Sequence, residues 1–303
     1  MNAVLPISAE VHGHFQGWSP PLPLTCVLVL VALFYLRGWL RLRSAFPNLI
    51  PVLRVTAFMS GLFFLWIAVG SPLSALDHES LTIHMINHLL LMTVAAPLIL
   101  AGAPRLILQG LPASFGRGVR DSVLQRLAAR RLLSLLQHPV FCWAVATATV
   151  IAWHLPKVFQ LSLRSHWWHH AEYASFALAG FLFWWPVLQP VPGVARWPRW
   201  SIPLYLFLAT LPCDILSAFL VFCGRVVYPS YLSAPRLFNF SAFQDQQCAG
   251  ALMWVWVTFA YLLPAVVITV QILFRSNGHS QHLQGASDAL ASPALSGSRP
   301  GVA

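Results

Sequence analysis

Charge is scarce in this sequence, and that scarcity excludes most classes of protein. Only 9% of the 303 residues are charged, with eight acids against eighteen bases, whereas soluble domains carry about 25%. So few charges cannot cover the surface of a water-soluble domain. The hydrophobic content of 58% also excludes a disordered or collagen-like chain. Five scattered cysteines, without a CxxC pair, do not make a secreted disulfide scaffold.

Several familiar motifs are also missing. The sequence contains no phosphate-binding Walker loop, no dinucleotide fingerprint and no nucleophile elbow. Nor does it contain a basic, aromatic-interleaved stretch suited to an aqueous nucleic-acid surface. We therefore expect no enzymatic activity and no nucleic-acid partner. The net charge of +10 instead comes from arginines placed between long apolar segments, which is typical of a polytopic membrane protein.

Seven stretches are long and apolar enough to cross a bilayer, for which roughly 20 residues are needed. The sequence therefore predicts an all-α bundle of seven transmembrane helices. The predicted spans are Leu22–Leu40, Leu53–Pro72, Leu81–Ala101, Pro139–Leu155, His169–Leu188, Ile202–Cys223 and Ala249–Phe274.

The positions of lysine and arginine predict how the spans are oriented. With the N-terminus outside, fourteen of these residues fall on the inner side and four on the outer side. Basic residues prefer cytoplasmic loops, so we expect the N-terminus outside and the C-terminus inside. This topology divides the chain into an extracytoplasmic segment (1–21), a transmembrane domain (22–275) and a disordered cytoplasmic tail (276–303). Residues 118–137 alternate leucine or valine with arginine, which predicts an amphipathic helix on the inner leaflet.

Ionisable side chains inside membrane spans are costly and usually functional. His84 and His88 are four residues apart, so both imidazoles share one helical face and could reach one metal ion. Met85 lies beside this pair, and the topology sends further donors from other spans towards the same outer half of the membrane. These candidates are His154, His169, His170, Asp214, Asp245, Met85 and Met253. We expect metal ligands among these side chains, although isolated histidines near span ends, such as His78, more often contact water or headgroups.

Imidazole, thioether and carboxylate donors together suit copper or zinc, and methionine favours Cu(I). The leading hypothesis is a copper site, with His84 and His88 as first ligands, followed by His154, His170 and His169. Asp214 and Asp245 would neutralise the cation, and Met85 or Met253 would assist. Cys223 and Cys248 both lie near the predicted outer surface, but their spacing does not establish a disulfide.

At these residues the chain resembles the caa3-type cytochrome c oxidase assembly factors of the CtaG type. The resemblance rests on an ordered set of motifs within residues 50–275. These motifs are HMINHLLLM at 84–92, APL at 96–98, GAP at 102–104, WHLP at 153–156, HHAE at 169–172, FWWPV at 183–187, DQQ at 245–247 and GALMW at 250–254. Asn87, where many relatives have Gln, and Cys248, where Gly or Ala is usual, depart from the pattern. The single-span copper chaperones that share the CtaG name form an unrelated family. They carry a soluble copper-binding domain, which this sequence does not contain.

The resemblance implies a seven-span protein of the bacterial plasma membrane that helps to build a haem-copper oxidase. Its partners would be the lipid bilayer and either oxidase subunits or other copper-handling assembly proteins. Three alternatives stay open at this point: a copper or proton transporter, a haem-binding membrane protein with histidine axial ligands, and a scaffold in which the polar cluster is a hydrogen-bonded core. The small number of ionisable residues in the inner halves of the spans argues against transport.

Overall fold

A computed structural model describes residues 20–45, 51–102, 138–188, 198–236 and 239–291. Within these ranges every regular element is a helix. The longer helices are α2 (Leu22–Ala45), α3 (Val52–Gly70), α4 (Leu81–Leu89), α9 (Pro139–His154), α10 (Pro156–Arg164), α11 (His166–Leu188), α12 (Ser201–Phe222) and α13 (Ala242–Ala291). The shorter elements are η1 (Pro72–Ala75), η2 (Leu90–Ala95), α5 (Ala96–Ala101) and η3 (Pro229–Leu232).

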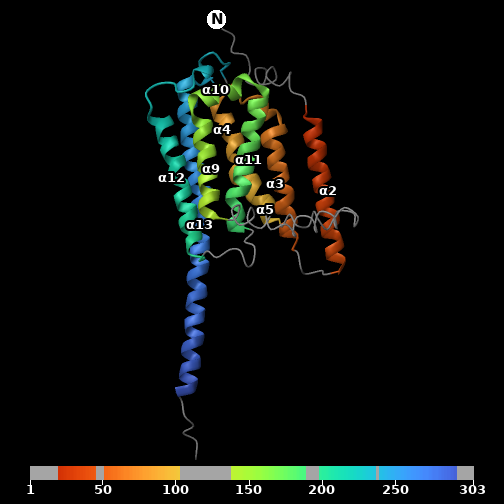
Figure 1. Cartoon of the computed structure of the whole chain (residues 1–303), viewed down its shortest axis with the longest axis vertical. Helices are drawn as coiled ribbons and strands as arrows, with labels where there is room; N and C mark the ends of the chain where they lie inside the picture. Colours follow the sequence, from red (N-terminus) through yellow and green to blue (C-terminus); the bar gives the residue numbers. More distant parts are fainter. Residues whose placement is uncertain (1–19, 46–50, 103–137, 189–197, 237–238, 292–303) are drawn as a thin grey trace, which may run out of the picture.

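The helices form a bundle of the predicted kind. In the described residues, six helices are long and apolar enough to cross a membrane, and a bent pair, α9 with α10, makes a seventh pass if it counts as one span. The all-α membrane architecture is therefore confirmed, while the inside and outside faces remain a prediction from charge. The helices run roughly side by side, with α2 at one edge and α12 at the other (Figure 1).

The shortest predicted span is the one that bends. Helices α9 and α10 meet at an angle of 75° on either side of Leu155. Pro156 follows directly, and a residue before proline is pushed out of the helical region; Leu155 accordingly has φ −67° and ψ 126°. As a result α10 lies across the upper end of the bundle in Figure 1 and covers the start of α4.

The central pass of the bundle is continuous but not uniformly α-helical. Helix α4 runs through a π-helical segment, η2, into α5, and this pass is the most buried of the spans. Helix α11 approaches η2 closely at Gly180, where an added Cβ would lie only 2.9 Å from the Met92 Cα atom. Trp184 of α11 donates a hydrogen bond to the Met92 carbonyl at 3.0 Å. Such π-segments often accompany functional sites, and this one directly follows His88.

Helix α13 is longer than the sequence predicted. It continues to Ala291 and extends beyond the other helices in Figure 1, so residues 276–291 are helical where a disordered tail was expected. The stretch contains no proline, the residue that most strongly interrupts a helix, and adding residues to a helix that is already formed needs no new nucleus. The predicted amphipathic helix at 118–137 and most of the 1–21 segment lie outside the described residues.

Candidate metal centre

Two buried histidines and a buried glutamate form the first cluster. His84 and His88 come from consecutive turns of α4, and their rings lie 4.3 Å apart between centroids. The Nε2 atoms of His84 and His88 lie 3.3 Å and 3.6 Å from the same oxygen, Oε1 of Glu172. His84 and Glu172 are fully buried. One ligand atom from each of the three residues fits within 4.8 Å of the others, so the cluster has the dimensions of a metal site.

Aromatic rings hold this cluster in place. Phe176 stacks on the His88 ring at 4.0 Å, and Phe159 meets the His84 ring edge-on at 4.8 Å. These contacts fix the direction of both imidazoles without hydrogen-bonding to them. Several polar atoms of the cluster consequently lack any hydrogen-bond partner: both ring nitrogens of His88, Nδ1 of His84 and Oε2 of Glu172.

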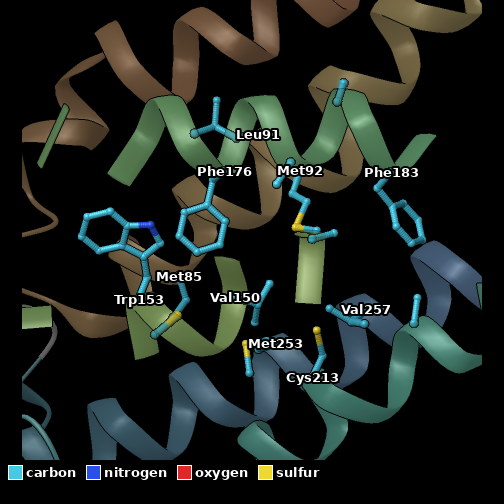
Figure 2. Packing of buried hydrophobic residues seen from close by; sticks show 14 of the residues in the cluster. Met85, Leu91, Met92, Val150, Trp153, Phe176, Phe183, Cys213, Met253 and Val257 are labelled. Carbon is cyan, nitrogen blue, oxygen red and sulfur yellow. The ribbon is translucent and has the colours of Figure 1, made fainter. Parts of the chain in front are cut away.

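A small cavity adjoins the cluster at His88. Its volume is about 30 Å³, enough to hold an occupant of the size of a water molecule. His88 lines it together with His154 of α9, and four sulfur-bearing side chains complete the donor set: Met85, Met92, Cys213 and Met253. Figure 2 shows the sulfur atoms of Met92, Cys213 and Met253 directed towards the same space beside Val150.

The His154 side chain presents a free nitrogen to this cavity. Its Nδ1 atom lies 2.7 Å from the carbonyl oxygen of Val150. A carbonyl only accepts hydrogen bonds, so in the neutral imidazole Nδ1 carries the proton and Nε2 carries a lone pair. The Nε2 atom is buried and has no partner. His154 is thus oriented as a metal-ligating histidine usually is, with one nitrogen anchored on a backbone oxygen.

A second cluster lies nearer the end of the bundle. His169 of α11 contacts Oδ2 of Asp77 at 2.8 Å, and His78 Nε2 lies 3.7 Å from Oδ1 of the same carboxylate. Burial by itself would raise the pKa of Asp77, but the hydrogen bond with His169 and the charges of the neighbouring histidines outweigh it and lower the pKa. Burial lowers the pKa of His78 despite the nearby carboxylate.

The structure therefore divides the predicted ligands between different places. His84, His88, His154, Met85 and Met253 surround the first cluster and its cavity. His169 belongs to the second cluster. His170 is exposed and pairs with His166, with 2.9 Å between their Nε2 atoms, so neither of these two imidazoles joins the buried group.

The two predicted carboxylates belong to neither cluster. Asp245 instead accepts hydrogen bonds at the start of α4, from the backbone nitrogens of Leu81 at 2.7 Å and Thr82 at 3.2 Å. Negative charge at a helix N-terminus is stabilising, so the carboxylate has a structural explanation there. Asp214 lies on α12, partly buried, where it interacts with Thr210. The correction has a physical reason: a span assignment gives depth, whereas the rotation of each helix decides which carboxylate faces the histidines.

Sequence reasoning did not select Glu172, Asp77 or Cys213 as site residues, and it considered Met92 only as a possible thioether donor near His84 and His88. Glu172 had a usable signal, since it is a carboxylate within an apolar span. Met92 lies on the same pass as His88, seven and four residues after Met85 and His88, a spacing that returns to nearly the same face of a helix. Nothing local marks Asp77 or Cys213. Cys223 and Cys248, whose pairing was left open, are free thiols in the structure.

Comparison with known proteins finds relatives along most of this chain. The chain is 24% identical over 275 residues to an uncharacterised protein of Mycobacterium leprae (strain TN), which covers 89% of this chain and 41% of the relative. It is 27% identical over 249 residues to uncharacterised proteins of Mycobacterium bovis and Mycobacterium tuberculosis, covering 80% of this chain and 37% of each relative. The chain thus spans about two fifths of the length of these relatives.

No solved structure matches the chain at a significant level. A family model, however, matches residues 33–275, the region that holds all the passes from α3 to α13 and both histidine clusters. With its multi-pass helical bundle, this chain belongs to the cytochrome c oxidase caa3 assembly factor family, Caa3_CtaG.

Proposed function

We propose that this protein binds copper between the His84, His88 and Glu172 cluster and the sulfur-lined cavity, and provides it during the assembly of a haem-copper oxidase. The family supports the assembly role. The observation that carries the copper proposal is that His88 and His154, which line the same cavity, have buried imidazole nitrogens without a hydrogen-bond partner.

Burying these nitrogens without a partner lowers the stability of the fold, unless a ligand binds them. A buried polar group without a hydrogen-bond partner costs roughly 1–3 kcal/mol, and buried polar groups in folded proteins are usually satisfied. The 30 Å³ cavity is large enough for one ion. An ion there would give His88 and His154 the partner that the protein itself does not provide.

The donor types favour copper in its reduced state. Three methionine thioethers and one cysteine surround the cavity beside the two imidazoles. Thioether and thiolate are soft ligands that select Cu(I), whereas magnesium, calcium and manganese prefer oxygen. Zinc accepts imidazole and thiolate, but methionine is not among its usual ligands. The combination of His88 with Met85, Met92 and Met253 therefore favours Cu(I).

A cation in a low-dielectric interior also needs charge compensation. Glu172 supplies it: the carboxylate is fully buried, 3.3 Å from His84 and 3.6 Å from His88, and its Oε2 atom is unpartnered. Carboxylate on one side and thioethers on the other would hold a monovalent ion with little net charge.

The position of the site supports delivery at one membrane face. His84 and His88 lie on α4 and Glu172 lies in the second turn of α11, so the cluster is near the end of the bundle at which these two helices begin (Figure 1). With the N-terminus outside, as the loop charges predict, this half faces the outside of the bacterial plasma membrane. The partners would be oxidase subunits or other copper-handling assembly proteins that reach that face. A porphyrin would not fit in this 30 Å³ cavity.

Anaerobic titration of the purified protein with Cu(I), in competition with a chromogenic chelator, tests the proposal. We expect one tightly bound Cu(I) in the wild type. Met85→Leu/Met253→Leu removes two sulfurs at nearly constant volume and should weaken binding by at least about tenfold, since even outer-shell changes at metal sites cost 10–100-fold. Met59→Leu is the matched control, because Met59 packs beside α2 in a separate core cluster.

His88→Ala should abolish high-affinity binding, because it removes the residue shared by the cluster and the cavity. The same variants are then placed in cells that depend on this gene for a haem-copper oxidase, and oxidase activity is measured. Equal Cu(I) affinity in the wild type, His88→Ala and the double methionine variant would refute the copper site. Full oxidase activity in cells lacking the gene would refute the assembly role.

A further inference from the structure

The second cluster has a different chemistry from the copper cavity. Asp77 and His78 lie in the loop between η1 and α4, and His169 lies in the first turn of α11. One ligand atom from each of the three fits within 4.8 Å of the others. Ligand atoms on one tetrahedral zinc ion lie roughly 3.3 Å apart, from bond lengths of about 2.0–2.1 Å. The two imidazoles lie on opposite oxygens of the Asp77 carboxylate, His169 at 2.8 Å from Oδ2 and His78 at 3.7 Å from Oδ1, so both are within a small adjustment of that spacing.

The Asp77 carboxylate is the unusual member of this cluster. It is fully buried, and its ion-pair partners among the described residues are His78 and His169, which are charged only when protonated. Its Oδ2 atom accepts hydrogen bonds from Tyr173 and His169 at 2.8 Å, but Oδ1 is buried without any hydrogen-bond partner. An anionic oxygen left in this state points to a missing cation.

A wide cavity gives the cluster access to solvent. It has a volume of about 410 Å³ and is lined by four imidazoles, from His78, His166, His169 and His170. His78 is half exposed, so an ion can reach the cluster from the cavity without opening the bundle. Water in this cavity would complete the coordination of an ion held by the three primary ligands.

We infer that Asp77, His78 and His169 form a second metal site, for a divalent ion of the Zn²⁺ or Cu²⁺ type. Two imidazoles and one carboxylate are typical ligands of such borderline ions. The cluster contains no sulfur, so it lacks the soft donors of the copper cavity. Calcium and magnesium are disfavoured, because they prefer all-oxygen sites.

An ion at this site would join two parts of the structure. His78 and Asp77 belong to the loop after η1, whereas His169 belongs to α11. Tyr173 connects Asp77 onward to α4, because its hydroxyl also accepts a hydrogen bond from Asn87 at 2.9 Å. The bound ion would therefore fix the loop over the end of α11, next to the pass that carries His84 and His88. This inference does not depend on copper binding in the inner cavity.

The test uses Zn²⁺ alone as the probe and a purification tag without histidines. After chelator treatment, bound zinc is counted by elemental analysis and its affinity is measured by calorimetry. We expect one Zn²⁺ in the wild type and a loss of affinity of at least about tenfold in both His78→Ala and His169→Ala. His78 is half exposed, so its substitution should leave folding intact, which thermal unfolding of the metal-free protein checks.

Two controls separate this site from its neighbours. The first is His166→Ala, because His166 lines the same cavity but is outside the cluster. The second is Met85→Leu/Met253→Leu, which alters only the inner cavity. Both should bind Zn²⁺ as the wild type does. X-ray absorption should find only nitrogen and oxygen ligands. Unchanged binding in His78→Ala and His169→Ala, an equal loss in His166→Ala, or sulfur ligands would each overturn the inference, whatever the Cu(I) titration gives.

Discussion

Replacing Asp245 by alanine separates a structural role from a metal-binding one. The carboxylate, on the first turn of α13, receives four hydrogen bonds from the start of α4: two from backbone nitrogens, of Leu81 and Thr82, and two from hydroxyls, of Ser80 and Thr82. Asp245 is only 8% exposed, so water cannot fully replace the carboxylate once it is gone. We expect Asp245→Ala to destabilise the bundle and to leave metal binding intact.

The size of the effect follows from the two backbone donors. The hydroxyls of Ser80 and Thr82 can rotate towards other acceptors, whereas the nitrogens of Leu81 and Thr82 are fixed by the helix. Each hydrogen bond to a charged group contributes about 1.5–3 kcal/mol, so the loss is on the order of 3 kcal/mol. For a domain of this size, each kcal/mol lowers the melting temperature by about 2–4 °C. A decrease of roughly 6–12 °C is therefore expected.

The assay is thermal unfolding in detergent, followed by tryptophan fluorescence, together with the Cu(I) titration at low temperature. Asp245→Asn keeps one acceptor oxygen and should fall between the wild type and Asp245→Ala. Asp214→Asn is the control, because Asp214 holds no helix end, and it should not lower the melting temperature. If Asp245→Ala lost copper while its melting temperature stayed unchanged, the carboxylate would be a site residue and this reasoning would be refuted.

Two further substitutions probe the packing around the clusters. Gly180→Ala places a Cβ atom 2.9 Å from the Met92 backbone, so α11 must move away from η2. We expect the free energy of unfolding to fall by about 1–3 kcal/mol because of overpacking, and Cu(I) binding to weaken. An unchanged melting temperature and an unchanged Cu(I) affinity would contradict the close approach. Gln246→Ala removes hydrogen bonds to the Leu220 and Arg225 carbonyls and from the Val227 nitrogen. Thermal unfolding should show a stability lower by about 2–3 kcal/mol, with Cu(I) binding retained. Loss of copper binding at unchanged stability would argue against a purely structural role for Gln246.

Much of the fold could be predicted because it depends on local properties. Each span from Leu22 to Phe274 is marked by an apolar stretch as long as the bilayer is thick, and the observed helices coincide with those stretches. The end of α13 is the exception. Low hydropathy after Phe274 was read as disorder, but polarity ends a membrane span without ending a helix, and residues 276–291 remain helical.

The candidate metal site could likewise be predicted only in part. His84 and His88 could be paired from the sequence, because four residues make about one helical turn, and their rings do lie together, 4.3 Å apart. Which side chains join them is not a local property. It depends on how α11, α12 and α13 are rotated about their axes, and that is decided by packing such as the contact of Gly180 with η2.

By itself, then, the sequence determined the all-α architecture, the positions of the apolar helices and the one pair of histidines that a single helix brings together. Only the tertiary structure shows that Glu172 contacts that pair and that Cys213 and Met253 line the cavity. It also shows that His169 lies with Asp77 and His78, and that Asp245 binds the start of α4. The physical reason is that helical periodicity fixes neighbours along one helix, whereas contacts between helices depend on interlocking side chains distributed over the whole chain.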